Sequence, residues 1–169
     1  PQAPAAALEA DLDVKSAHFL VRVSVAQDDV QVSAEALVAR AAATGSAFAL
    51  LGGEPAVRAL VDRFYDLMDL EPGYAGIRRL HAADLDHARD KLFWFLCGWL
   101  GGPDHYVHRF GPPRLRARHL PFAIGIAERD QWLACMGQAM SECGVEPALT
   151  ERLQAAFFNT ADWMRNKGG

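Results

Sequence analysis

The 169-residue chain has few of the features that mark membrane, secreted or nucleic-acid-binding proteins. No apolar run approaches the ~18–20 residues that a membrane span needs, and no basic region followed by an apolar core stands near the N-terminus. The formal net charge is −4 and the arginines concentrate in one short segment, so no broad basic surface is expected. We therefore expect a cytoplasmic protein that has neither a membrane nor nucleic acid as a partner.

Cysteine is scarce and lacks metal-binding or redox spacing. Cys97, Cys135 and Cys143 form no Cys-x-x-Cys pair and fall in or beside apolar, helix-like segments, so we interpret them as buried reduced thiols. His105 and His108, with the neighbouring aspartate, could bind zinc across one helical turn. This remains a weak alternative, because no cysteine lies near to complete four ligands.

Residues 1–45 form an N-terminal extension in which two periodicities compete. Apolar residues between positions 8 and 23 suit a helix face, whereas residues 19–25 alternate and are β-branched, as a strand would be. We favour a helix there, since a lone strand would need a partner. Ser33 as an N-cap and Gly45 as a stop predict a second helix over residues 34–43. The extension is thus expected to be partly helical or flexible.

Apolar residues at spacings of three and four predict four longer helices in the rest of the chain. These helices cover about residues 54–69, 85–99, 126–140 and 147–167. Tyr65 falls toward the buried side of the first, and Trp132 lies on the apolar face of the third. Residues 103–118 show no lasting periodicity and predict a loop with at most a short helix.

The segment 114–122 concentrates cations beside one imidazole. Arg114, Arg116 and Arg118 alternate in front of His119, and a proline and Phe122 close the segment. One interpretation is a solvated basic face that an unrelated histidine happens to follow. The other is a histidine that ligates a metal inside an anionic organic cofactor, with arginines paired to its carboxylates. The residues alone leave both open.

Several motifs recur in a characteristic order. They are Leu-Leu-Gly-Gly-Glu at 50–54, Arg-Phe-Tyr at 63–65, Trp-Leu-Gly-Gly-Pro at 99–103, the segment 114–122 and Glu-Arg-Asp-Gln-Trp at 128–132. Over residues 46–166 the chain resembles a group II truncated haemoglobin. The resemblance implies an all-α, 2-on-2 globin domain over residues 46–169, with helices B and E and helices G and H around haem b.

The resemblance also implies roles for individual residues. His119 matches the proximal histidine, which ligates the iron, and Lys91 and Tyr106 match contacts to the haem propionates or edge. Arg116 suits a propionate by its residue type. The remaining expected pocket residues are Ala88, Leu92, Phe95, Phe122 and Trp132. On the open side of the iron, Tyr65, His81 and Trp132 are expected to form a polar distal cluster in which each provides a hydrogen-bond donor.

Three functions stay open at this stage. The first is reversible binding of dioxygen or a related diatomic ligand at a five-coordinate iron. The second is a haem enzyme, a nitric oxide dioxygenase or peroxidase, with a reductase as a possible partner. The third is a cofactor-free helical interaction module. A monomer and a homodimer are both compatible with the sequence.

Overall fold

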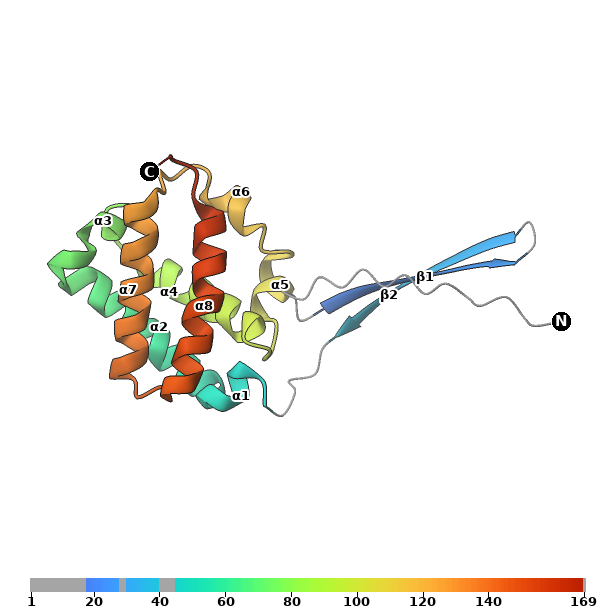
Figure 1. Cartoon of the computed structure of the whole chain (residues 1–169), viewed down its shortest axis with the longest axis horizontal. Coiled ribbons are helices and arrows are strands. Elements are labelled where there is room, and N and C mark those ends of the chain that lie inside the picture. The colour runs from blue at the N-terminus through green and yellow to red at the C-terminus, as the bar shows by residue number, and fades with distance from the viewer. Residues whose placement is uncertain (1–17, 28–29, 40–44, 169) are drawn as a thin grey trace.

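The computed structural model describes residues 18–27, 30–39 and 45–168, and describes side chains for residues 45–168 (Figure 1). The chain begins with strands β1 (His18–Gln27) and β2 (Val30–Ala39). The helical part then contains α1 (Ala47–Leu51), α2 (Gly53–Leu70), the 3-10 helix η1 (Pro72–Tyr74), α3 (Ala75–Arg78), α4 (Asp86–Trp99), α5 (His105–Phe110), α6 (Leu115–His119), α7 (Ile126–Glu142) and α8 (Pro147–Met164).

The long helices form two pairs, α2 with α4 and α7 with α8, and α2 also packs on α7 (Figure 1). This is the two-over-two arrangement that the family resemblance implies. Each helix buries an apolar stripe, since residues three and four apart share one face of a helix. The stripe of α2 includes Leu60, Val61 and Phe64, and that of α7 includes Met136 and Met140. These faces meet in one continuous core.

Two glycines after α4 allow a close approach that a larger residue would block. Gly101 has φ +92°, a left-handed conformation that glycine adopts without strain. A Cβ on Gly102 would lie 2.5 Å from the ring of Phe48 in α1. The predicted stop after α4 is confirmed, and the same glycines let α1 lie against the end of that helix.

The helices expected within the N-terminal extension are wrong for residues 18–27 and 30–39, which are strands. They form an antiparallel hairpin in which His18 pairs with Ala39 and Gln27 pairs with Val30. The alternating, β-branched pattern of residues 19–25 is typical of a strand, and a strand needs a partner. That partner is β2, which overlaps the segment predicted as a helix over 34–43. Residues 1–17 and 40–44 lie outside the described part of the chain.

The segment predicted as a loop contains two short helices, α5 and α6. Asp104 caps α5 by accepting a hydrogen bond from the Val107 amide at 3.3 Å. The zinc alternative gains no support, because among the described residues no three His, Cys, Asp or Glu side chains gather as a metal site. Cys97 and Cys135 are buried as expected, whereas Cys143 is exposed and corrects the third thiol assignment. It directly follows the last residue of α7, where the helix no longer buries a face.

No helix within the described ranges combines the length and the hydropathy that crossing a bilayer requires. Most of the long helices carry charged residues on the faces that they do not bury. Arg58, Asp62 and Asp66, for example, follow one another at four-residue spacing along α2.

Two leucines on α2 offer a matched test of the core. Leu60 is 1% exposed and Leu70, at the end of the same helix, is 72% exposed. We expect Leu60→Ala to lower the free energy of unfolding by about 2–5 kcal/mol, because it removes buried apolar contacts and leaves a cavity. The same change at Leu70 should stay within about 0.5 kcal/mol. Urea unfolding followed by circular dichroism measures both, and similar values for the two variants would contradict the packing described.

Candidate functional site

His119 is the last residue of the five-residue helix α6, and its imidazole is oriented by its own helix. Its Nδ1 lies 2.7 Å from the carbonyl oxygen of Leu115. A carbonyl only accepts hydrogen bonds, so Nδ1 carries the proton and donates it. The lone pair of the neutral ring is therefore on Nε2, which points away from that hydrogen bond. A histidine held in this way is prepared to ligate a metal.

The end of α8 fastens the segment that carries His119. The side-chain amide nitrogen of Asn166 donates to the carbonyl oxygens of His119 at 3.2 Å and of Phe122 at 2.7 Å. Arg116 donates to the carbonyl of Trp163 and, at 3.2 Å, to that of Arg165. The structure thus gives Arg116 a role in holding α6 to α8. Its contact with a cofactor carboxylate stays a prediction.

One face of α4 is apolar yet only partly buried. Ala88, Leu92, Phe95 and Trp99, at spacings of four, three and four, pack against the core but keep part of their surface accessible. Large apolar side chains on the surface need an explanation when they share one face. This face is a candidate wall for a flat apolar ligand.

Aromatic contacts join this wall to the segment that carries His119. The ring of Tyr106 in α5 lies 6.3 Å from that of Phe95, and the guanidinium of Arg118 lies 5.9 Å from the Tyr106 ring. Phe122, beyond α6, is 42% exposed. Phe95, Tyr106 and Arg118 thus form a continuous set of contacts that joins α4, α5 and α6.

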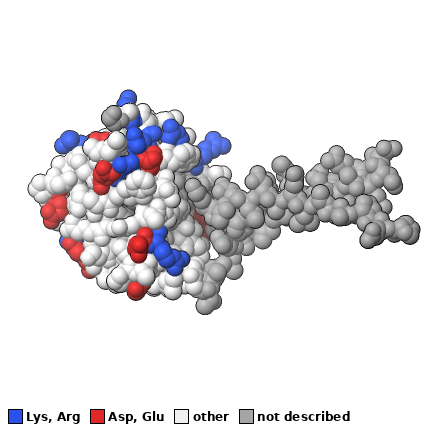
Figure 2. All heavy atoms as spheres, in the orientation of Figure 1, with Lys and Arg blue, Asp and Glu red and all other residues white. Residues whose placement is uncertain are grey.

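Exposed cations border the same region. Lys91 projects from α4 with its Nζ 6.0 Å from the centre of the Phe110 ring, next to Tyr106. Figure 2 shows blue Lys and Arg side chains gathered at the end of the molecule where α6 and the C-terminus lie, among a few acidic ones. A carboxylate of a bound ligand would find cationic partners here.

A second cluster combines residues of α2 and of the segment that follows α3. Tyr65 is 5% exposed, and its ring lies 5.8 Å from that of His81 in an edge-on arrangement of 80°. Nδ1 of His81 lies 2.9 Å from the carbonyl oxygen of Ile77, so this nitrogen carries the proton. The neutral ring then presents a bare Nε2, which accepts a hydrogen bond. The expectation that His81 donates holds only for its protonated form.

Trp132 on α7 approaches this cluster through Phe64, whose ring lies 5.3 Å from the indole. The other neighbour of Trp132 is Phe157 at 5.4 Å, and Phe157 is stacked on Trp99 at 4.8 Å. Within residues 45–168, neither the Trp132 indole N–H nor the Tyr65 hydroxyl makes a hydrogen bond. Two donors on apolar bodies are thus available to a ligand.

Burial decides the protonation states in the cluster. It raises the pKa of Tyr65 well above its usual range, against the opposing effect of Arg89, so the phenol keeps its proton. Burial is also the main reason that the pKa of His81 lies below its ordinary value. The bond to Ile77 opposes this shift, and the charges of Arg78 and His119 add to it.

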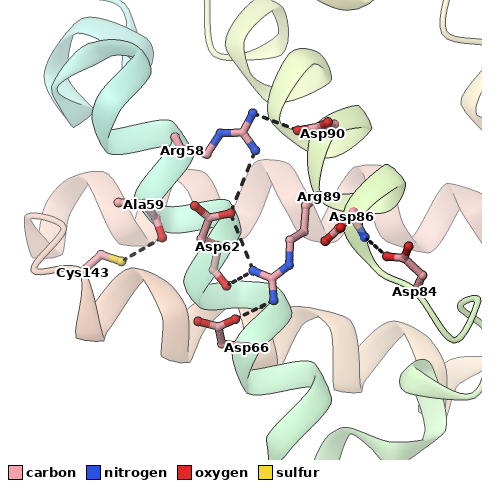
Figure 3. Close-up of polar contacts among 9 residues, drawn as sticks. All are labelled: Arg58, Ala59, Asp62, Asp66, Asp84, Asp86, Arg89, Asp90 and Cys143. Carbon is pink, nitrogen blue, oxygen red and sulfur yellow. Dashed lines mark hydrogen bonds and ion pairs between the residues drawn. The ribbon is translucent and has the colours of Figure 1, made fainter.

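Ion pairs between α2 and α4, which were not predicted from the sequence, join the two helices (Figure 3). Arg89 donates to the Asp62 carbonyl at 2.8 Å and to the Asp66 carboxylate at 2.5 Å, and its guanidinium lies 5.7 Å from the Tyr65 ring. Arg58 reaches Asp90 at 3.1 Å. The four-residue spacing of residues 58, 62 and 66 was the available signal, since it places them on one helix face.

The model of the bacterial-like globin family matches residues 46–166. The chain belongs to this family. The globin is 38% identical over 115 residues to the group 2 truncated haemoglobin YjbI of Bacillus subtilis (strain 168), over 68% of this chain and 85% of the relative. The resemblance to group II truncated haemoglobins is confirmed.

Solved structures of similar proteins show the same 2-on-2 fold. The group II 2-on-2 haemoglobin from the plant pathogen Agrobacterium tumefaciens is 42% identical, with a TM-score of 0.71 over 75% of this globin and 97% of that chain. The truncated oxygen-avid haemoglobin from Bacillus subtilis is 36% identical, with a TM-score of 0.66 over 72% of this globin and 100% of that chain.

Membership of a globin family implies haem as the cofactor. The residues of this globin fit that group. His119 has a bare Nε2, the α4 face offers partly exposed apolar surface, and Lys91 and Arg118 border it with positive charge. A neutral imidazole, an apolar wall and cations for two carboxylates are the donor set that haem requires.

The lowered pKa of His81 predicts a pH effect on stability in the haem-free globin. In the unfolded chain this histidine takes up its proton near pH 6.5, whereas the folded state resists protonation to lower pH. Unfolding therefore binds a proton in this window, and the free energy of unfolding falls as the pH drops below 6.5. We expect His81→Gln to reduce the loss between pH 7.5 and pH 5, measured by urea unfolding. The same loss in both proteins would contradict the assignment.

Proposed function

We propose that the globin reversibly binds dioxygen, or a related diatomic ligand, at the iron of a haem b that His119 ligates. The observation that carries the proposal is the pairing of a bare His119 Nε2 with the two unused donors of Tyr65 and Trp132. Ferrous haem with one protein ligand supplies an open coordination position for a small molecule. The oxygen-avid relative from Bacillus subtilis supports dioxygen as the ligand.

The distal residues would favour a ligand that accepts hydrogen bonds. The hydroxyl of Tyr65 and the indole N–H of Trp132 are donors, and they are held in apolar surroundings where a hydrogen bond is strong. Neutral His81 offers an acceptor close to Tyr65, and the choice of Tyr65 between this acceptor and the ligand would tune affinity. Dioxygen, which accepts such bonds better than carbon monoxide, benefits more.

The remaining predicted residues would hold the cofactor. Ala88, Leu92 and Phe95 would cover it from α4, and Phe122 from the segment after α6. Lys91, Tyr106 and Arg116 would contact the carboxylates of the haem. Arg118 is better placed than Arg116 for such a contact, because its guanidinium already lies over the Tyr106 ring.

The role of His119 predicts the spectra of the haem-loaded protein. We expect His119→Gly to abolish the spectrum of the five-coordinate ferrous form, because the axial donor is gone. Added imidazole should restore that spectrum by filling the space of the lost ring. Haem titration followed in the Soret band provides the measurement, with His87→Ala as an exposed control on α4. A spectrum in His119→Gly like that of the parent protein would overturn the assignment.

The role of Trp132 predicts the rate of ligand release. Trp132→Phe keeps the aromatic body and removes the N–H, so we expect dioxygen to dissociate at least about tenfold faster, given about 1.5–3 kcal/mol for such a hydrogen bond. Flash photolysis or stopped-flow mixing gives the rate. Trp163→Phe is the matched control, since Trp163 is 56% exposed on α8. Equal rates for the two variants would show that the indole is not a donor to the ligand.

The same site could support an enzyme, and turnover would separate the two functions. Slow autoxidation with negligible consumption of substrates favours reversible binding. Rapid steady-state consumption of nitric oxide or peroxide with an added reductant would instead indicate a dioxygenase or peroxidase, together with a reductase as partner.

A further inference from the structure

The segment that forms α5 and α6 carries positive charge without any carboxylate. Residues 105–127 include Arg109, Arg114, Arg116 and Arg118 but neither aspartate nor glutamate, although the formal net charge of the whole chain is −4. Figure 2 shows Lys and Arg side chains gathered at the end of the molecule where α6 lies. These four arginines define a basic surface, and the charge of the globin is therefore unevenly distributed.

The ion pairs of the globin leave the basic surface out. Among the residues that the structure describes, no arginine of this surface pairs with a carboxylate, whereas six arginines elsewhere do. These six are Arg58, Arg63, Arg78, Arg89, Arg129 and Arg165. The positive charge of the basic surface is thus not compensated by the described part of the chain.

Neutral groups nevertheless orient these side chains. The guanidinium of Arg109 lies 4.5 Å from the centre of the Trp94 ring, and Arg118 donates to the Pro113 carbonyl at 3.1 Å. Arg116 donates to carbonyls at the end of α8. Aromatic faces and carbonyls hold a guanidinium in place without neutralising it. Side chains held in this way lose less conformational entropy when a partner binds them.

Exposed apolar side chains lie beside these cations. Trp163 is 56% exposed, and its ring lies 5.9 Å from the Arg116 guanidinium. Leu120, directly after α6, is 58% exposed. Tryptophan and arginine are enriched where protein–protein interfaces bind most strongly, and guanidinium groups match carboxylates with two parallel hydrogen bonds. Duplex nucleic acid would need a broader basic surface. These features favour a protein that presents carboxylates.

We propose that the basic surface docks an electron-carrier protein whose own surface is acidic. Carboxylates of that partner would pair with the arginines, and opposite charges would steer the encounter. The choice of an electron carrier rests on the proposed function, because the basic surface adjoins the residues assigned to the haem carboxylates. Arg116 and Arg118 belong to both sets. Arg109 and Arg114 have no assignment at the cofactor, so their charge remains for the partner when haem is bound.

The first test is the salt dependence of docking. The probe is an acidic flavodoxin that carries a fluorophore, and its binding to the haem-loaded full chain is followed by fluorescence anisotropy. We expect the dissociation constant to rise at least about tenfold between about 20 and 300 mM salt, because salt screens the attraction. If the net charge of −4 governed the encounter, two acidic proteins would repel each other and salt would tighten binding.

Charge reversal locates the docking surface. Arg114→Glu and Arg152→Glu change the net charge equally, both residues are exposed, and neither belongs to the ion pairs named above. Arg152 lies near the start of α8, at the end of that helix away from α6 (Figure 1). At low salt we expect Arg114→Glu and Arg109→Glu each to weaken flavodoxin binding at least about fivefold. Arg152→Glu should change it less than about twofold.

Three outcomes would overturn the proposal. The first is a parent chain that does not bind the flavodoxin, or that binds it more tightly as salt rises. The second is equal weakening by Arg114→Glu and Arg152→Glu, which would show that net charge alone matters. The third is equally tight binding of duplex DNA or of phosphatidylglycerol vesicles with the same loss in Arg114→Glu, which would indicate a general polyanion site.

The Soret band of each chain separates this proposal from the proposed function. A chain that takes up haem and binds dioxygen but shows one of those three outcomes retains the proposed function and loses the docking surface. A chain that takes up no haem contradicts the proposed function. The same flavodoxin titrations of that haem-free chain, judged by the same three outcomes, then decide whether the basic surface binds an acidic protein.

Discussion

The hydrogen bond from Nδ1 of His119 to the Leu115 carbonyl is the constraint on which the site depends. It fixes the tautomer, and with the tautomer it fixes which nitrogen can ligate iron. A five-residue helix could not hold this geometry alone, because short helices are marginal without tertiary contacts. Two hydrogen bonds supply those contacts between α6 and the residues at the end of α8. Asn166 donates to the His119 carbonyl, and Arg116 donates to the Arg165 carbonyl. The orientation of one imidazole thus depends on residues more than forty positions away.

His81 was expected to donate a hydrogen bond, but its neutral ring can only accept one at Nε2. The reason is again that a carbonyl oxygen accepts and never donates, so the proton of His81 lies on Nδ1. Because its proton is committed to Ile77, the neutral ring faces Tyr65 with a lone pair. The predicted distal cluster would then contain two donors and one acceptor in place of three donors. Acidification would turn His81 into a third donor, yet burial lowers its pKa and delays that change. Near neutral pH, the proposed donors to a ligand are therefore Tyr65 and Trp132.

The sequence predicts what depends on local periodicity and misses what depends on partners distant in the chain. The stripes of α2, α4, α7 and α8 are visible in the spacing of apolar residues, so the long helices were predictable. The hairpin was missed because a strand is stable only beside its partner, and β2 also carries residues that favour helices. Asn166 lies just after α8, and no sequence motif indicates that its side chain donates hydrogen bonds to the carbonyls of His119 and Phe122. The roles expected of His119 and Trp132 came from the family resemblance, because spacing alone left them undecided.

The half-buried face of α4 connects the stability of the fold to its function. Arg58 and Arg89 hold α4 to α2 by ion pairs on partly exposed side chains, and pairs of this kind contribute little each. The apolar residues Leu92 and Phe95, in contrast, keep accessible surface that a flat apolar ligand would bury. A ligand that binds only the folded state stabilises it in proportion to its affinity. The ion pairs are therefore suited to orient this face in advance, whereas the larger stabilisation would come from a ligand that covers it.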